Sequence, residues 1–256
     1  MSPSTPPLRC RTRLDGLTLA WLEIPAGSQS ATDLPVVLIH GLGMSARSFE
    51  PLLAALNDGP RALAIDLPGS GRSGSRGRLG VPEDLIRLLW KWIDARGVDR
   101  LVLVGHSLGA QVVTHLAACQ PDRVASMVLI APAPDPDAGG DAQTALRLLR
   151  GWLHERPKFM AYAIAYFLRS RPHRMWRVPR RAMAASDPDI LRQVRAPALL
   201  VRGAHDWVST AAGVRKLAEA FGDAHVEEVE GPHGLQFAVP DVIADAVRRA
   251  AREGAG

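Results

Sequence analysis

Cysteine is scarce in this chain, which has only two among its 256 residues, Cys10 and Cys119. Two cysteines are too few for a disulfide framework, and neither belongs to a C-x-x-C pair of the kind found in zinc and redox sites. We therefore expect both thiols to be reduced and structural.

Long hydrophobic runs are also missing. The longest apolar stretch, 159–168, has about ten residues, whereas a transmembrane helix needs roughly 20. The N-terminus is polar and rich in proline, and it lacks the apolar core and the small-residue cleavage site of a signal peptide. These absences predict a cytoplasmic protein without integral membrane association.

The loops after the expected strands give little support for nucleotide binding. G-x-x-x-x-G-K-S/T does not occur, and G-x-G-x-x-G occurs at 69–74, in the loop after the strand at 61–66, where its glycines suit a sharp turn rather than a phosphate cradle. The eight histidines do not form a set with the spacing of metal ligands. We therefore expect neither a nucleotide, nor a metal, nor another cofactor.

Positive charge is concentrated in one segment of the chain. The formal net charge is +5, yet residues 142–186 hold ten Lys or Arg against one acid, Glu155, so this segment carries +9 and the rest about −4. Such an insert can attract a substrate with a carboxylate or phosphate, or an acidic carrier partner. Substituting Arg174 and Arg177 with Ala would test this. The alternatives are a solvated face and a module that binds membranes or nucleic acid. We expect no nucleic-acid partner.

Short apolar runs alternate with helical patterns, as in the βαβ units that build a parallel sheet. The expected buried strands are 34–40, 61–66, 101–106, 126–131, 198–202 and 225–229. Asp15-Gly16 predicts a hairpin turn between strands at 12–14 and 17–24. Helices are expected from Pro82 to Gly97, after Ser107, and near the C-terminus over 242–252.

The alternation breaks between about Asp135 and Arg195. This stretch begins with Pro, Asp and Gly residues, then shows helical spacing at Leu146, Leu149 and Leu153, followed by further prolines. We interpret it as a helical cap, residues 135–195, inserted into an α/β core formed by residues 1–134 and 196–256.

The segment 105–109 has the sequence G-H-S-L-G and matches G-x-S-x-G directly between an expected strand and an expected helix. A nucleophile on such a tight turn needs small neighbours, because the helix packs closely against the strand. The turn would expose the Ser107 hydroxyl and place the Leu108 N–H at a helix N-terminus, where it can stabilise an oxyanion. His40-Gly41-Leu42-Gly43 ends another strand, and the Leu42 N–H is the candidate for the second donor.

A serine hydroxyl needs a base within hydrogen-bonding reach, and the base needs an orienting acid. Two late loops offer these groups, since Asp206 follows the strand at 198–202 and His233 follows the strand at 225–229. The order Ser107, Asp206, His233 is the one expected for this kind of elbow. His205 is the rival base, and Asp135 and Asp137 are alternative acids.

Together these motifs resemble the α/β-hydrolase family from about Leu17 to Arg252. HGLG after a strand, DLPGSGRSG, VGHSLGA, a late G-x-x-D and a later PHG occur in the family's order and spacing. The resemblance implies an α/β fold, with a mostly parallel eight-stranded sheet flanked by helices and a lid inserted after the sixth strand. It places Ser107, Asp206 and His233 at the triad positions, and Leu42 and Leu108 at the oxyanion-hole positions.

The resemblance implies a serine hydrolase that cleaves a carboxylic ester, thioester or lactone through an acyl-enzyme, without a cofactor. The family also includes perhydrolases and C–C bond hydrolases, so these activities stay open, as does a non-catalytic ligand-binding role. A serine nucleophile argues against a dehalogenase or an epoxide hydrolase, which use a carboxylate at this position.

Aromatic side chains of the cap, and one beside the expected acid, are candidates for an acyl pocket, with core packing as the alternative for each. They are Trp152, Phe159, Tyr162, Tyr166, Phe167, Trp176 and Trp207. The expected partner is a small-molecule acyl substrate, neutral or anionic.

Overall fold

The computed structural model describes residues 6–28, 30, 33–75, 82–132, 150, 151, 155, 157, 159–161, 164, 165 and 188–254. Its strands are β1 (Leu8–Leu14), β2 (Leu17–Ile24), β3 (Val36–Ile39), β4 (Ala62–Ile65), β5 (Leu101–His106), β6 (Val124–Ile130), β7 (Ala198–Gly203) and β8 (Ala224–Val229). Its helices are α1 (Glu50–Ala55), α2 (Pro82–Asp94), α3 (Leu108–Cys119), α7 (Pro188–Leu191), α8 (Ala211–Ala220), α9 (Leu235–Ala238) and α10 (Pro240–Glu253), with short 3₁₀ turns η1 (Ala46–Phe49) and η2 (Pro121–Arg123).

The eight strands form one sheet in the order β1-β2-β4-β3-β5-β6-β7-β8. β1 pairs antiparallel with β2, and β2 antiparallel with β4, while every later neighbouring pair is parallel. The predicted α/β class and the mostly parallel eight-stranded sheet are therefore confirmed.

The hairpin predicted at Asp15-Gly16 joins β1 to β2. Both turn residues have positive φ, 48° for Asp15 and 72° for Gly16, and Leu14 pairs directly with Leu17 across the turn. Positive φ at both central positions is the geometry that favours Asp-Gly, because it matches the twist of the two strands.

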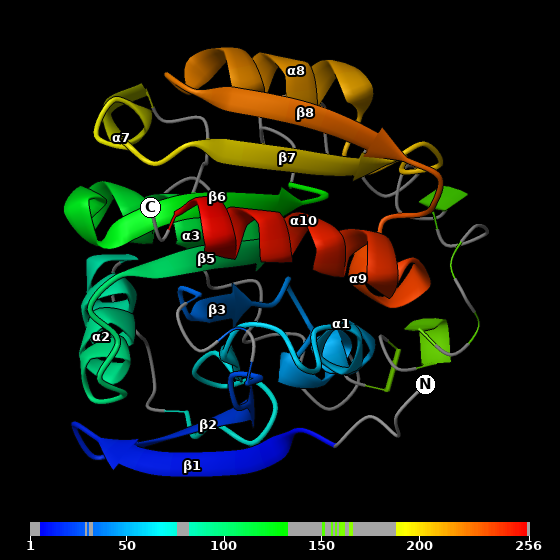
Figure 1. Cartoon of the computed structure of the whole chain (residues 1–256). Helices are drawn as coiled ribbons and strands as arrows, with labels where there is room; N and C mark the ends of the chain where they lie inside the picture. The colour runs from blue at the N-terminus through cyan, green and yellow to red at the C-terminus, as the bar shows by residue number, and fades with distance from the viewer. Residues whose placement is uncertain are drawn as a thin grey trace.

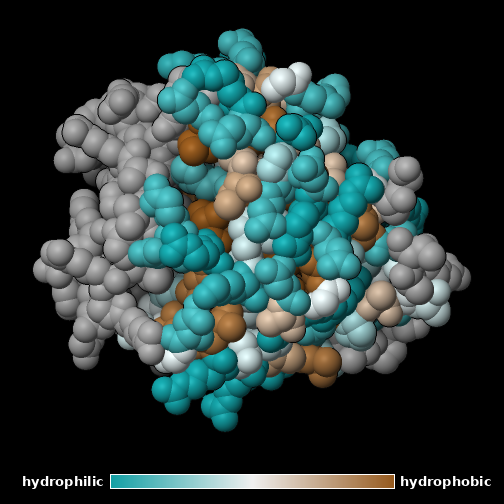
Figure 2. Space-filling view, turned by 90° about the vertical axis from the view of Figure 1, so that its left-hand side faces the viewer, coloured by the Kyte–Doolittle hydropathy of each residue, from teal (hydrophilic) through white to brown (hydrophobic). Residues whose placement is uncertain are grey.

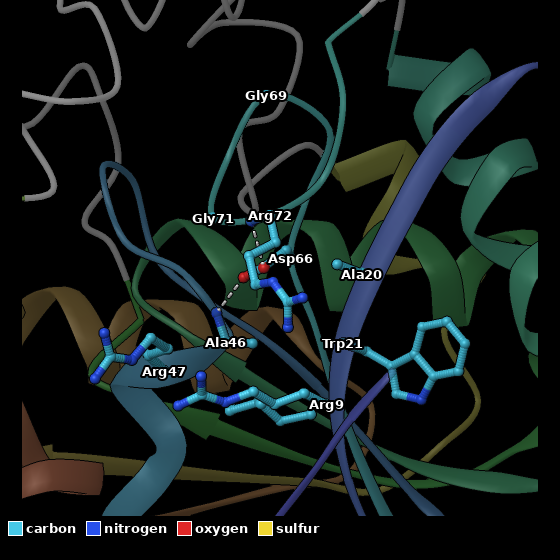
Figure 3. A pocket seen from close by; sticks show the side chains of 10 residues that line it. Arg9, Ala20, Trp21, Ala46, Arg47, Asp66, Gly69, Gly71 and Arg72 are labelled. Atoms are coloured by element: carbon cyan, nitrogen blue, oxygen red, sulfur yellow. Dashed lines mark hydrogen bonds between the residues drawn. The ribbon is translucent and has the colours of Figure 1, made fainter. Parts of the chain in front are cut away.

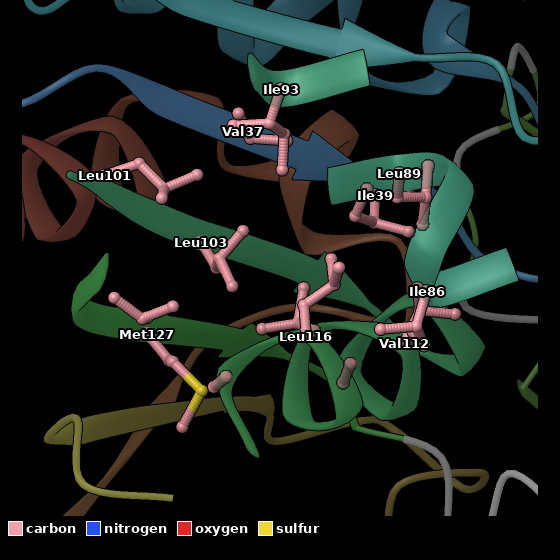
Figure 4. Packing of buried hydrophobic residues seen from close by; sticks show 14 of the residues in the cluster. Val37, Ile39, Ile86, Leu89, Ile93, Leu101, Leu103, Val112, Leu116 and Met127 are labelled. Atoms are coloured by element: carbon pink, nitrogen blue, oxygen red, sulfur yellow. The ribbon is translucent and has the colours of Figure 1, made fainter. Parts of the chain in front are cut away.

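Alternating side chains of the central strands enter two separate hydrophobic clusters. Val37 and Ile39 of β3 point to one face of the sheet, whereas Val36 and Leu38 point to the other. The first cluster packs against α2, α3 and α8, and the second against α1 and α10. Figure 4 shows the first cluster, where side chains of α2 and α3 cover those of β3, β5 and β6.

Helices therefore cover both faces of the sheet, with α10 and α1 in front of it in Figure 1. Burial on both faces explains why β3, β4, β5 and β6 are buried along their whole length and read as continuous apolar runs. The parallel strands β5 to β8 all point to the same side in Figure 1, so the loops that follow them meet at one edge of the sheet.

The expected cap falls between β6 and β7, which are neighbours in the sheet. Most of its residues lie outside the described ranges, but 150, 151, 159–161, 164 and 165 are helical. No described helix is both long enough and apolar enough to cross a bilayer. The face on which the parallel strands begin is covered mainly by hydrophilic residues, with hydrophobic ones in separate patches (Figure 2).

Candidate active site

Ser107 sits on a strained turn between β5 and α3. Its φ is 53° and its ψ −118°, a conformation that residues with a side chain adopt only where the surrounding structure holds it. The Ser107 N–H donates to the Ile130 carbonyl at 2.9 Å, and the Ser107 carbonyl accepts from the Ala110 N–H at 3.0 Å. These bonds anchor the turn to the neighbouring strand β6 and to the first turn of α3.

Two glycines allow this turn because the backbones around it approach each other closely. A Cβ at Gly105 would lie 2.6 Å from the Ala110 Cα, and one at Gly109 would lie 2.1 Å from the Ile39 carbonyl oxygen. Both distances are well below van der Waals contact, so any side chain there would push α3 away from the sheet. The small residues of the motif are thus explained by packing.

The loop after β3 packs directly against Ser107. A Cβ at Gly41 would lie 3.2 Å from the Ser107 Cβ and 3.1 Å from Nδ1 of His106. The Ser107 side chain is partly exposed, and within the described ranges its hydroxyl has no hydrogen-bond partner.

The structure brings Asp206 and His233 together from the loops that follow β7 and β8. Nδ1 of His233 lies 2.8 Å from Oδ2 of Asp206. The Asp206 side chain is fully buried, while 16% of the His233 side chain stays exposed. With the proton on Nδ1 donated to Asp206, the other ring nitrogen of His233 is free to act as a base.

The second oxygen of Asp206 is held by its own loop. Oδ1 accepts from the N–H groups of Val208 and Ser209, each at 2.8 Å. Burial raises the pKa of the Asp206 carboxyl, but the attraction of His233 and these hydrogen bonds outweigh it, so the pKa lies below its ordinary value. The carboxylate is therefore both ionised and fixed in orientation.

Close packing also sets the position of the two loops. A Cβ at Gly203 would lie 2.2 Å from the Gly231 carbonyl oxygen, and the N–H of His205 donates to that same oxygen at 3.0 Å. The hydroxyl of Ser209 donates to the Pro132 carbonyl at 2.8 Å, which ties the Asp206 loop to the end of β6.

Glu155, the single acid of the basic segment 142–186, is a neighbour of His233. Its Oε1 accepts from the Gly234 N–H at 2.9 Å, and its Oε2 is buried with no partner in the described part of the chain. Burial raises the pKa of Glu155. Glu155 lies 78 residues before His233 along the chain, so no local pattern could have linked them.

The charge state of His233 follows from these neighbours. Burial lowers the pKa of the ring, but the negative charges of Asp206 and Glu155 outweigh this effect and raise the pKa above the ordinary value of 6.5. A raised pKa makes His233 a stronger base than an isolated imidazole.

The two expected oxyanion donors lie on the loops beside Ser107. Leu108 is the first residue of α3, and Leu42 lies on the loop that contacts Ser107, with 40% of the residue exposed. Among the described residues, neither N–H has a hydrogen-bond acceptor. Both groups are thus available to a ligand oxygen.

The remaining histidines near the site have structural contacts. Burial lowers the pKa of His106 to about 3, so the ring is neutral and its Nε2–H can donate to the His233 carbonyl at 3.1 Å. His40 contacts the Gly41 carbonyl through Nδ1 at 2.8 Å and accepts from the Leu67 N–H at 3.1 Å. The rival base His205 instead pairs with Glu230 on the surface, at 2.5 Å.

Two of the expected substrate-binding residues can be placed. Phe159 is buried and packs on Phe237, with ring centroids 5.5 Å apart, in contact with Gly234. Trp207 is 44% exposed, and the Arg150 guanidinium lies 5.7 Å from its ring centroid. The other candidates lie outside the described residues, as do the alternative acids and the two arginines proposed for testing: Trp152, Tyr162, Tyr166, Phe167, Trp176, Asp135, Asp137, Arg174 and Arg177.

Within the described ranges, no group of three or more His, Cys, Asp or Glu side chains is arranged to hold a metal ion. The arrangement around Ser107 is suited to proton transfer, with a buried carboxylate, an imidazole bonded to it, and two backbone N–H groups beside a serine that have no acceptor in the described part of the chain.

Comparison with known proteins places the chain in a family. Residues 35–166, more than half of the chain, match the family model of the alpha/beta hydrolase fold. The dihydrolipoyllysine-residue acetyltransferase component of the acetoin cleaving system of Pseudomonas putida is 34% identical over 126 residues, which are 48% of this chain and 32% of that protein. The pimeloyl-acyl-carrier-protein methyl ester esterase of Pectobacterium carotovorum subsp. carotovorum is 33% identical over 117 residues, 46% of this chain and 42% of that protein. The chain thus spans less than half the length of these relatives.

Solved structures agree in fold over nearly the whole chain. A bacterial membrane phospholipase A superposes with a TM-score of 0.79 at 22% identity, covering 97% of this chain and 86% of that one. The haloalkane dehalogenase DatA from Agrobacterium tumefaciens C58 gives 0.76 at 18% identity, covering 97% of each chain. At such identities these likenesses show the fold alone. Together with the family match, they establish that the chain belongs to the α/β-hydrolase family.

Proposed function

We propose that the protein is a serine hydrolase that cleaves a carboxylic ester, thioester or lactone through an acyl-enzyme. The observation that carries this proposal is the 2.8 Å contact between Nδ1 of His233 and the buried carboxylate of Asp206, on loops beside the strained Ser107 turn. This pairing is the one needed to turn a serine hydroxyl into a nucleophile.

In the acylation step, Oγ of Ser107 attacks the carbonyl carbon of the substrate while Nε2 of His233 takes the hydroxyl proton. Asp206 stabilises the imidazolium that forms, because it is ionised and accepts the Nδ1–H. The leaving alkoxide, or thiolate, then takes the proton from His233, and Ser107 carries the acyl group.

The carbonyl oxygen becomes an oxyanion during this attack. The N–H groups of Leu42 and Leu108, which have no acceptor among the described residues, are the proposed donors to it. Removing one preorganised donor of this kind lowers kcat roughly 100- to 1,000-fold. In the second half-reaction His233 takes a proton from water, the hydroxide attacks the acyl carbon, and Ser107 is released with its proton.

The proposal includes the segment 135–195 as a cap over this site and a small acyl compound as the substrate. One relative is named a methyl ester esterase, so acyl methyl esters belong among the compounds to test. Aromatic residues of the cap would contact the acyl chain, and Phe159 already lies against the His233 loop at Gly234.

The experiment is pre-steady-state hydrolysis of p-nitrophenyl esters, followed by steady-state hydrolysis of an acyl methyl ester and a lactone. An acyl-enzyme predicts a burst of p-nitrophenol with an amplitude close to the concentration of protein, since each site releases one equivalent before deacylation. Ser107→Ala should lose both burst and turnover, whereas the control Ser70→Ala should keep them. Turnover that persists in Ser107→Ala, or a folded wild-type protein that consumes none of these compounds, would contradict the proposal.

A further inference from the structure

A hollow lies at the edge of the sheet where β1 and β2 meet η1 and the loop after β4. Its volume is about 290 Å³. Arg9 from β1, Arg47 from η1 and Arg72 from the loop after β4 line it (Figure 3). Ser107, Asp206 and His233 do not contribute to its wall.

The sequence of β1 explains why Arg9 points into this hollow. Arg9, Arg11 and Arg13 alternate along the strand, so all three project from one face of the sheet, while Cys10 and Leu14 project from the other and pack on the first hydrophobic cluster. Arg9 pairs in register with Leu22, which also lines the hollow.

Positive charge in the hollow is only partly compensated. Arg47 forms an exposed ion pair with Glu50 at 3.0 Å. Arg9 and Arg72 are exposed and have no acidic partner within the described part of the chain. The one acid in the wall, Asp66, is buried, and its oxygens are already occupied by the N–H groups of Ala46 and Arg72, each at 2.8 Å.

The loop that carries Arg72 is held in place by the same contacts. Both N–H bonds to Asp66 join η1 to the loop after β4, and a hydroxyl bond from Ser73 to the Asp66 carbonyl at 2.6 Å adds a third. The three arginine side chains therefore extend from a backbone frame that is already ordered, and they lie around one space in Figure 3.

We propose that this hollow binds the phosphate group of a phosphorylated ligand. A guanidinium group presents several donors in a planar fork that matches phosphate oxygens, and a phosphate has enough acceptor oxygens to meet more than one arginine. The volume of the hollow is close to that of the smallest known small-molecule sites, about 300 Å³. It is therefore large enough for a ligand bigger than a single small ion. An alternative role for Arg9 is to prevent edge-to-edge aggregation, because charged residues on an edge strand have that effect. Arg11 and Arg13 already supply such charge on β1, and neither lines the hollow.

The test measures binding of pyrophosphate to the full chain by calorimetry, and of the protein to vesicles of phosphatidylcholine with and without phosphatidic acid. We expect saturable binding of one of these two phosphate sources. Arg9→Gln and Arg72→Gln should each weaken it about tenfold or more, because each removes charge-assisted hydrogen bonds. Arg13→Gln removes the same charge from the same strand outside the hollow, and it should change the affinity less than about twofold.

The two arms separate the sources of the phosphate. Binding of free pyrophosphate with this variant pattern supports a soluble ligand, and binding only to vesicles that contain phosphatidic acid, with the same pattern, supports a lipid headgroup. Equal weakening in Arg13→Gln would show general attraction to a basic surface and overturn the site. Absence of binding in both arms, with each variant folded by circular dichroism, would overturn it as well.

Discussion

At the scale of single residues, the proposed chemistry depends on how Asp206 is held. Its two oxygens have separate tasks: Oδ2 meets His233 at 2.8 Å, and Oδ1 is fixed by the N–H groups of Val208 and Ser209. An amide at this position keeps the shape but loses the charge and places an N–H donor where an acceptor is needed.

Asp206→Asn should therefore lower kcat/KM by roughly 1,000- to 10,000-fold, as expected when the base loses its correct tautomer. Ester hydrolysis with the folded state checked by circular dichroism measures this. Asp189→Asn, at an exposed surface carboxylate, serves as the control and should leave kcat/KM unchanged. A fall in Asp135→Asn with no fall in Asp206→Asn would instead assign the acid to the segment after β6.

Glu155 gives a second prediction at this scale, through the pH profile. His233 must be neutral to accept the proton of Ser107, so activity is lost as pH falls through its pKa. Because Asp206 and Glu155 raise that pKa, the acid limb of kcat/KM should lie above pH 6.5. Glu155→Gln removes one negative charge, which lowers the pKa of His233 and moves the limb to lower pH.

The control for this shift is Glu230→Gln, which removes a carboxylate that is 81% exposed in the neighbouring loop. Water screens such a charge, so the limb should stay in place. If the acid limb of kcat/KM stayed in place in Glu155→Gln, or moved equally in Glu230→Gln, Glu155 would have no specific effect on the pKa of His233.

At the scale of elements, the strands and the helices α2, α3 and α10 could be predicted from sequence, whereas the ten-residue helix α8 and the short helices were not predicted. β5 has the expected bounds, and β7 begins at the expected residue and ends one residue later than expected. Buried parallel strands are recognisable in this way because they are continuous apolar runs between glycine-rich turns. α1 and α9 have six and four residues, too short for a periodic pattern. They depend on packing with the rest of the fold, which the local sequence does not reveal.

The same limit applies to the site. The loops that carry Ser107, Asp206 and His233 could be located from sequence, because each follows a strand and contains glycine or proline. The contact of Glu155 with Gly234 could not, since it joins segments 79 residues apart. Contacts of this kind join the segment between β6 and β7 to the loop after β8, and no periodicity encodes them.

Gly109→Ala tests the packing of α3 on the sheet. The added methyl group would lie 2.1 Å from the Ile39 carbonyl oxygen, so the helix has to move and the Ser107 turn with it. We expect a loss of roughly 1–3 kcal/mol in the free energy of unfolding, the usual cost of overpacking, or a protein that does not fold. Urea denaturation measures it.

Gly222→Ala is the matched control, because nothing lies within 4 Å of a Cβ at that position. Its effect should stay within about 0.5 kcal/mol, as for ordinary surface changes. If the two variants were equally stable, close approach of the backbone would not be the reason for glycine at position 109.

At the scale of the whole molecule, two hydrophobic clusters hold the helices on either side of the sheet. Leu103, in the middle of β5, is fully buried in the cluster shared with α2 and α3. Leu103→Ala should cost about 2–5 kcal/mol of stability, since it leaves a cavity that close-packed neighbours cannot fill. Val242→Ala, at a residue that is 47% exposed, should change stability by less than about 0.5 kcal/mol. Equal midpoints in urea would contradict this account of the core.

The whole molecule also separates two kinds of site. The proposed catalytic groups lie on the loops after β5, β7 and β8, whereas the arginine-lined hollow lies between β1, β2, η1 and the loop after β4, and the two sites share no residue. Loss of Arg9 or Arg72 should therefore leave the reactivity of Ser107 intact, and loss of His233 should leave phosphate binding intact.

The central claim is that Ser107 is an activated nucleophile, and its most direct test is labelling with a fluorophosphonate probe, read by peptide mass spectrometry. We expect selective modification of Ser107 in the wild-type protein. Ser107→Ala should lose this label, and His233→Ala should lose it too, because the hydroxyl then has no base. An unlabelled Ser107 in a folded wild-type protein, or full labelling in folded His233→Ala, would contradict the account.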